Sequence, residues 1–133
     1  MSGKYLLGNM LSAIHNKKFF YEKPVVVEYN GLCEDVLKVM ENAGYVKEFK
    51  IVENEGKKNI EVLLQIIAGR KTINSFKLVS KPGCRQYADK DKMKKILSYN
   101  PFALTIVSTS KGVIQVKEAV ELGVGGEVLC EIF

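Results

Sequence analysis

The C-terminal part of the chain carries the residue types best suited to bind a charged partner. Ser108-Thr109-Ser110-Lys111-Gly112 combines hydroxyls with a lysine, and eleven residues later the stretch 123–127 reads Gly-Val-Gly-Gly-Glu. Hydroxyls, backbone N–H groups and a lysine offer donors that suit phosphate oxygens and ribose hydroxyls better than a metal ion or a small substrate. The two stretches therefore predict a polyanion site, and we favour structured RNA as its ligand.

The distribution of charge supports this interpretation. The 133 residues carry a formal net charge of +5. Residues 1–66 hold nine lysines and nine acidic residues, whereas residues 70–111 hold ten basic residues against only Asp89 and Asp91. Such a segregated field attracts phosphate chains and makes binding salt-dependent, because neutralised phosphates release counterions. A solvated lysine-rich surface is the alternative explanation, and residues 89–95 are typical of a solvated helix face.

Catalytic and nucleotide-binding sites fit the sequence less well. His15 is the only histidine and lies just before two lysines on a predicted helix, which favours a surface position. Ser108 has no Gly-x-Ser-x-Gly elbow. The glycines of 123–126 precede a predicted strand, so they lack the helix N-terminus that holds phosphate in nucleotide-binding loops. The sequence indicates no enzyme, no cofactor, no metal site and no small-molecule substrate.

Several residues of the predicted site have two interpretations. The glycines of 123–126 serve either a tight turn with positive φ or the close approach of another backbone. Glu127 would repel phosphate, so we expect its carboxylate to accept hydrogen bonds from a base amino group or from its own loop; an ordinary strand-end glutamate is the alternative. Tyr87, with Arg85 and Lys81, has the chemistry to contact nucleic acid, but a tyrosine here equally suits the core.

Cysteines and apolar runs indicate the compartment. Cys33, Cys84 and Cys130 have no paired spacing and sit among apolar or mixed neighbours, which predicts buried or partly buried free thiols in a reducing compartment. No apolar run reaches the roughly 18 residues that a membrane helix needs. The first residues lack the features of a secretory signal or a transit peptide. We therefore expect no membrane partner and a protein that works where it is made.

Hydrophobic periodicity predicts the elements of the first half. The expected order is a helix over 5–16, a buried strand over 25–29, a second helix over 32–43 between Asn30 and Gly44, and a hairpin of strands around 49–51 and 60–66. This order predicts an α/β domain over residues 1–67 in which two helices cover one face of a three-stranded sheet.

The composition changes at Ala68-Gly69-Arg70-Lys71, where we place the domain boundary. Beyond it we expect a strand over 72–80, a turn at 81–83, an extended segment 84–87, a basic helix capped by Asp89, a central strand over 102–108, a short helix over 116–122 and a final strand over 127–133. Residues 68–133 thus predict a mostly β domain with short helices, packed against the first. The predicted fold class is α+β.

Several segments resemble one protein family. Residues 106–113, Glu118-Ala119 and residues 122–130 are similar to the signature of the bacterial-type eighth protein of the small ribosomal subunit. Residues 79–87 resemble the family's central Ser-Lys-Pro-Gly-x-Arg-x-Tyr segment, residues 9–16 resemble its first helix, and residues 43–46 resemble the end of its second helix. The resemblance implies a primary binder of the central domain of small-subunit ribosomal RNA, which helps the platform assemble beside neighbouring small-subunit proteins.

The resemblance also implies which residues contact RNA. Together with the basic residues beside them, the expected set is Ser108, Thr109, Ser110, Lys111, Gly112, Gly125, Gly126, Glu127, Tyr87, Arg85 and Lys81. A weaker contribution is expected from the first helix, through Ser12, Asn16 and Lys17.

Departures from the family pattern suggest a divergent ribosome. The family usually has arginines where Ala13 and His15 stand, and residues 114–117 replace a Met-Thr-Asp-Arg stretch, which weakens the cap of the next helix. We expect the small ribosomal subunit of an organelle such as a mitochondrion, or of a bacterial cytoplasm. Two other classes stay open. One is a regulatory module that binds messenger RNA or a protein partner through the same face. The other is a small enzyme built on Ser108, His15 and Glu127.

Overall fold

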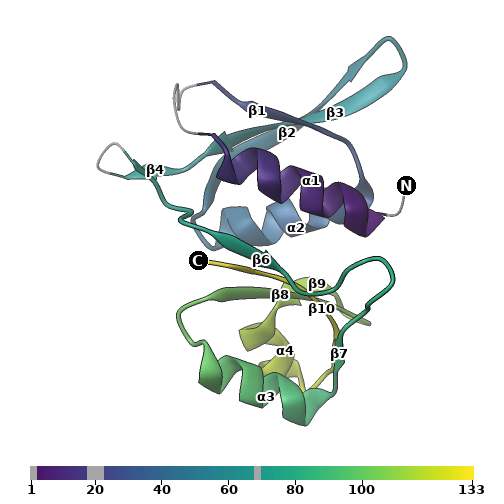
Figure 1. The fold of residues 1–133 in the computed structure, drawn as a ribbon, viewed down its shortest axis with the longest axis vertical. Helices are drawn as coiled ribbons and strands as arrows, with labels where there is room; N and C mark the ends of the chain where they lie inside the picture. Colours follow the sequence, from purple (N-terminus) through teal and green to yellow (C-terminus); the bar gives the residue numbers. More distant parts are fainter. Residues whose placement is uncertain (1–2, 18–22, 68–69) are drawn as a thin grey trace. The chain divides into compact units, whose positions relative to one another are not determined.

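The chain divides into two compact units, residues 1–74 (unit 1) and residues 75–133 (unit 2). The structure, a computed structural model, describes residues 3–17, 23–67 and 70–133 (Figure 1). The domain boundary predicted between residues 67 and 68 adjoins residues 68–69, which lie outside the described residues. That boundary and the packing of the two domains therefore stay predictions.

Unit 1 is a three-stranded antiparallel sheet with two helices on one face (Figure 1). The sheet has the strand order β1-β3-β2, and a separate two-stranded ladder joins β4 to β5. The elements in chain order are α1 (Gly3–His15), β1 (Val25–Glu28), α2 (Gly31–Asn42), β2 (Val46–Asn54), β3 (Lys57–Leu64), β4 (Ile66–Ile67) and β5 (Arg70–Lys71).

Local signals in the sequence account for the helices of unit 1. The side chain of Asn30 caps α2 by accepting a hydrogen bond from the backbone N–H of Leu32 at 2.8 Å, as predicted. Gly44, just beyond the helix, has φ +88°, which suits glycine. Apolar residues at helical spacing form the buried stripe of α1, which consists of Leu7, Met10, Leu11 and Ile14. The predicted buried strand over 25–29 is only half-buried, since Val26 points outward with 59% of its surface exposed.

Unit 2 is a mostly antiparallel β-structure with two helices against one face of its sheet. The strand order is β6-β10-β8-β9, and β7 also pairs with β10. The elements are β6 (Phe76–Leu78), β7 (Tyr87–Ala88), α3 (Lys90–Tyr99), β8 (Leu104–Thr109), β9 (Gly112–Gln115), α4 (Val116–Leu122) and β10 (Gly126–Ile132). The predicted α+β class is therefore confirmed.

The core of unit 2 lies between the sheet and its two helices. Its buried members are Ala88, Met93, Val107, Val116, Ala119 and Val128. As predicted, Asp89 caps α3, because its carboxylate accepts a hydrogen bond from the backbone N–H of Lys92 at 2.8 Å. Gln115 makes no side-chain cap bond to α4, which agrees with the weakened cap expected there.

Two predicted elements of the second half differ from the structure. The strand expected over 72–80 is confined to β6. The backbone N–H of Thr72 donates a hydrogen bond to the carbonyl of Gln65, and the side chain of Ile73 is buried. Residues 72–74 therefore belong to unit 1 and do not extend the strand. The short strand β9 was not predicted. Its apolar residues are only Val113 and Ile114, too few for a period-two pattern to be recognised.

The three cysteines are free, and two of them are buried. Burial raises the pKa of the Cys33 thiol to about 11 and, with a smaller contribution from Glu131, that of Cys130 to about 12. Cys84 is exposed, so the prediction that all three thiols are buried or partly buried is wrong for this residue. It lies at the end of the exposed turn that begins at Lys81, with which its backbone pairs.

No helix within the described ranges is long and apolar enough to span a membrane. The same residues contain no group of three or more histidine, cysteine or acidic side chains that could hold a metal ion.

We expect native protein to react with one equivalent of a maleimide at neutral pH, at Cys84. Cys33 and Cys130 should react only after denaturation, because burial excludes the reagent and favours the neutral thiol over the reactive thiolate. Mass spectrometry of labelled peptides measures this. Rapid labelling of Cys130 in the folded protein would contradict its placement.

Candidate functional site

The two polar stretches singled out in the sequence meet at one end of the sheet in unit 2. Strands β8 and β10 are antiparallel, with Ser108 opposite Glu127 and Thr109 opposite Gly126. The end of β8 therefore lies beside the beginning of β10. Strand β7 flanks the same end of β10 on its other side, with Tyr87 opposite Glu127. The fold thus brings together residues from three separate segments.

The stretch 108–112 comprises the end of β8, the turn of the β8–β9 hairpin and the first residue of β9. The Thr109 hydroxyl donates to the carbonyl of Gly112 at 3.0 Å and accepts from the backbone N–H of Lys111 at 3.0 Å. Gly112 has φ +107°, a conformation that favours glycine. These contacts fix the turn and leave Ser110 and Lys111 exposed at its tip. Thr109 therefore organises the turn with its side chain.

The chain between β6 and β7 is anchored on a bulge of β10. The backbone N–H groups of Val79 and Ser80 both donate to the carbonyl of Leu129, at 3.0 and 3.3 Å. Further on, the backbone N–H of Val128 donates to the carbonyl of Gln86 at 2.9 Å. The register of β10 against β8 shifts between Val128 and Cys130, so Leu129 is the extra residue. The bulge thus holds both ends of the loop 80–86 against the strand that carries Glu127.

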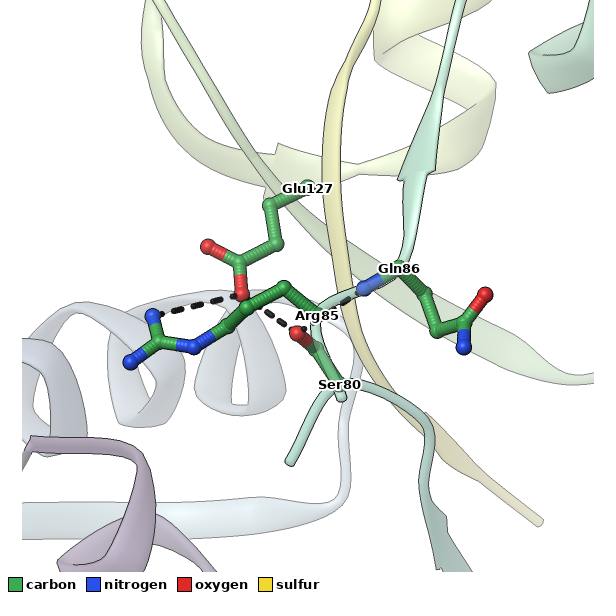
Figure 2. Close-up of polar contacts among 4 residues, drawn as sticks. All are labelled: Ser80, Arg85, Gln86 and Glu127. Carbon is green, nitrogen blue, oxygen red and sulfur yellow. Dashed lines mark hydrogen bonds and ion pairs between the residues drawn. The ribbon is translucent and has the colours of Figure 1, made fainter. Parts of the chain in front are cut away.

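Glu127 is the centre of a polar cluster that this loop completes (Figure 2). Its side chain is buried, with 9% of the residue exposed. The Ser80 hydroxyl donates a hydrogen bond to Oε2 of Glu127, and the Arg85 guanidinium nitrogen Nη1 lies 3.9 Å from the same oxygen. The Ser80 oxygen also accepts from the backbone N–H of Gln86 at 3.2 Å. Hydrogen bonds to a carboxylate are stronger than neutral ones, so this cluster fixes the loop 80–86 on β10.

Three predicted residues form a row across neighbouring strands. Directly opposed residues of antiparallel strands share a face, so Tyr87, Glu127 and Ser108 lie on one side of the sheet. Their strand neighbours Ala88 and Val107 belong to the core beneath α3 and α4, so the row lies on the opposite face. Tyr87 is 64% exposed, and the alternative that it fills the core is wrong.

Gly125 and Gly126 of the second stretch are required for close approach, not for positive φ. Only Gly123 is left-handed, at φ +68°, where it ends α4. A Cβ on Gly126 would collide with the carbonyl oxygen of Ser108, and one on Gly125 would lie 2.5 Å from the carbonyl oxygen of Ala88. Of the two interpretations left open by the sequence, backbone approach applies to both of these glycines, and the approaching strands are β8 and β7 of the same chain.

The remaining predicted residues are less closely grouped. Lys81 and Arg85 are exposed on the 80–86 loop, beside the row. Ser12, Asn16 and Lys17 belong to the other unit, at the C-terminal end of α1, with Ser12 and Asn16 exposed. His15 also lies in α1, so unit 2 contains no histidine that could act as a base for Ser108.

Ser80 is a site residue that the sequence did not predict. Its 1% exposure and its bond to Glu127 make it the residue that secures the carboxylate. The only signal was its position in the family-like segment 79–87, because the two partners lie 47 residues apart in the chain.

Comparisons with known proteins match nearly the whole chain. Residues 6–133 match the family described as ribosomal protein S8. The chain is 38% identical to the small ribosomal subunit protein uS8 of a Nitratiruptor species, over 96% of this chain and 97% of the relative. It is 37% identical to uS8 of Methylococcus capsulatus over 95% of each chain, and 39% identical to uS8 of Syntrophus aciditrophicus over 96% of each.

We expect Gly126→Ala to lower the free energy of unfolding by about 1–3 kcal/mol, because the added methyl group overpacks against the Ser108 backbone. Gly31→Ala is the matched control, since a Cβ there meets nothing within 4 Å. It should raise stability by about 0.5 kcal/mol through the unfolded state. Urea denaturation measures both, and equal stabilities of the two variants would contradict the close approach of β8 and β10.

Proposed function

Because the chain belongs to the ribosomal protein S8 family, we propose that it is a structural, non-enzymatic protein of the small ribosomal subunit that binds ribosomal RNA. The relatives that it matches carry the name of a small-subunit protein. We propose further that its target is the central domain of the small-subunit RNA, where it would help the platform assemble beside neighbouring proteins.

The observation that carries this proposal is the convergence of three segments at one end of the sheet in unit 2. The hairpin turn presents the exposed Ser110 and Lys111, and the adjacent loop presents Lys81 and Arg85. Tyr87 directly follows this loop and is 64% exposed. This combination of hydroxyls, cations and an aromatic ring matches the groups that proteins use to contact RNA phosphates, ribose hydroxyls and unpaired bases.

The geometry favours recognition of a folded RNA over catalysis. The donors sit on rigid strand ends and a tight turn, which preserves their spacing. The shallow minor groove of an RNA helix presents 2′-hydroxyls and phosphates to such a surface, and shape then contributes to selection. Unit 2 has no histidine to activate Ser108, and Glu127 is engaged by Ser80 and Arg85.

Glu127 has a positioning role in this proposal. A carboxylate facing phosphate would weaken binding, but this one is buried and bonded to Ser80. Its proximity to Arg85 also orients a guanidinium, the side chain best shaped to pair with phosphate oxygens. We propose that Glu127 holds Arg85 and the loop 80–86 in place for RNA, and does not read a base itself.

We expect Lys111→Ala to weaken binding to a central-domain RNA fragment and to reduce the slope of log affinity against log salt by about 0.9, the value for one phosphate contact on a duplex. Lys47→Ala, at an exposed lysine of β2 in unit 1, is the matched control and should change neither quantity. Filter binding at several salt concentrations measures both. An unchanged slope in Lys111→Ala would remove this residue from the site.

The same RNA fragment tests the proposal as a whole. Binding that is undetectable or independent of salt would overturn it. Sedimentation separates the regulatory alternative, because a structural protein travels with assembled small subunits whereas a free regulator stays in the soluble fraction.

A double-mutant cycle tests the role of Glu127. If Glu127 acts through Arg85, Glu127→Gln should weaken RNA binding in the wild-type background and have little effect in the Arg85→Ala background, because interacting residues are non-additive. Thermal unfolding of each variant separates stability from affinity. Losses that simply add in the double variant would show that Glu127 acts on RNA binding independently of Arg85.

A further inference from the structure

The outer side of α3 presents a line of cations that the site described above does not use. Met93, Ile96 and Leu97 face the core of unit 2. Lys92, Lys95 and Tyr99 follow one another at spacings of three and four, so they lie along one face of the helix. Both lysines and the tyrosine are exposed.

Two aromatic side chains at and just beyond the C-terminal end of α3 are almost entirely exposed to solvent. Tyr99, the last residue of α3, is 88% exposed, and Phe102, in the turn that leads to β8, is 95% exposed. The next most exposed large apolar side chain in the described part of the chain is Tyr87, at 64%. Scattered exposed hydrophobic residues are ordinary, but these two almost fully exposed rings are three positions apart in the chain, at the end of a helix that carries four lysines.

The charge of this surface favours an anionic partner. Residues 90–102 carry Lys90, Lys92, Lys94 and Lys95 against one acid, Asp91. The neighbouring Asp89 is occupied as the cap of the helix. Helix α4 packs beside α3 and carries one lysine and two glutamates. The excess positive charge of this helix pair therefore lies on α3.

We propose that α3 and the following turn bind an unpaired, single-stranded RNA segment, with bases stacked on Tyr99 and Phe102 and its backbone along Lys92 and Lys95. Aromatic rings beside a basic track are the combination by which proteins hold single strands, since every base has a face that can stack. A docked protein fits less well, because lysines are depleted at the centres of protein interfaces.

This surface is distinct from the row of Tyr87, Glu127 and Ser108. The two lie on opposite faces of the sheet in unit 2, since α3 covers the face opposite to that row. One RNA groove cannot therefore supply both contacts, and α3 would take a second, single-stranded segment of the RNA. The inference rests on the proposed function, because it assumes that RNA is the partner.

A short RNA separates the two sites. We expect the full chain to bind a ten-nucleotide oligouridylate, and Tyr99→Leu/Phe102→Leu to weaken that binding about tenfold or more, because leucine keeps the apolar surface but cannot stack. Tyr99→Phe/Phe102→Tyr should bind like the wild type. Val26→Ala, at another exposed apolar residue in unit 1, is the control and should have no effect. All of these substitutions are at exposed positions, so none should change the midpoint temperature of thermal unfolding.

The position of contact is measured by photocrosslinking with 5-iodouridine in the same oligonucleotide. We expect the crosslinked peptides to contain Tyr99 or Phe102, and Lys92→Ala/Lys95→Ala to flatten the salt slope by about 1.4 for two contacts on a single strand.

Undetectable binding of the oligonucleotide would overturn the inference, as would equal binding by the leucine variant or crosslinks confined to other residues. Tight binding of a polyglutamate peptide that the leucine variant retains would also overturn it, in favour of an acidic protein partner. Failure of the proposed function can be distinguished from failure of this inference. In that case the chain would not bind the central-domain RNA fragment, whether or not it binds the oligonucleotide.

Discussion

The hydrogen bond from Ser80 to Glu127 is the constraint on which the arrangement of the site depends. A carboxylate with so little exposure costs free energy unless donors satisfy it, and Ser80 supplies one from a loop 47 residues away in the chain. The same hydroxyl accepts from the backbone of Gln86, so one side chain connects β10 to both ends of the loop. The positions of Arg85 and Tyr87 follow from that connection.

The second constraint is the tight meeting of three backbones around the start of β10. Gly125 approaches the carbonyl of Ala88, and Gly126 approaches that of Ser108. A side chain at either position would push β7 or β8 away from β10 and separate Tyr87 and Ser108 from Glu127. The glycines thus set the width of the row, although neither needs positive φ. Their role in the fold and their role in the site are the same physical requirement.

Much of the fold was predictable because its signals are local. Asn30 and Asp89 cap helices through bonds to residues two and three positions away, and apolar spacing alone located α1. The bond between Ser80 and Glu127 was not predictable, because no local pattern joins residues so distant in the chain. The outward direction of Val26 and the hairpin partner β9 also depend on pairing between strands. The polar stretches were therefore predictable from the sequence, whereas the contacts that hold them together were not.

In the proposed function, the sheet of unit 2 separates two modes of RNA contact by chemistry as well as by direction. One face presents donors held at fixed spacing by strand pairing, which suits a rigid, double-helical shape. On the other side of the sheet, the outer surface of α3 presents exposed lysine side chains and exposed rings, which suit a flexible strand whose bases are free to stack. A solvated helix face accounts for the lysines of α3. It does not account for Tyr99 and Phe102, whose apolar rings are almost fully exposed, and RNA stacking supplies a reason for their exposure.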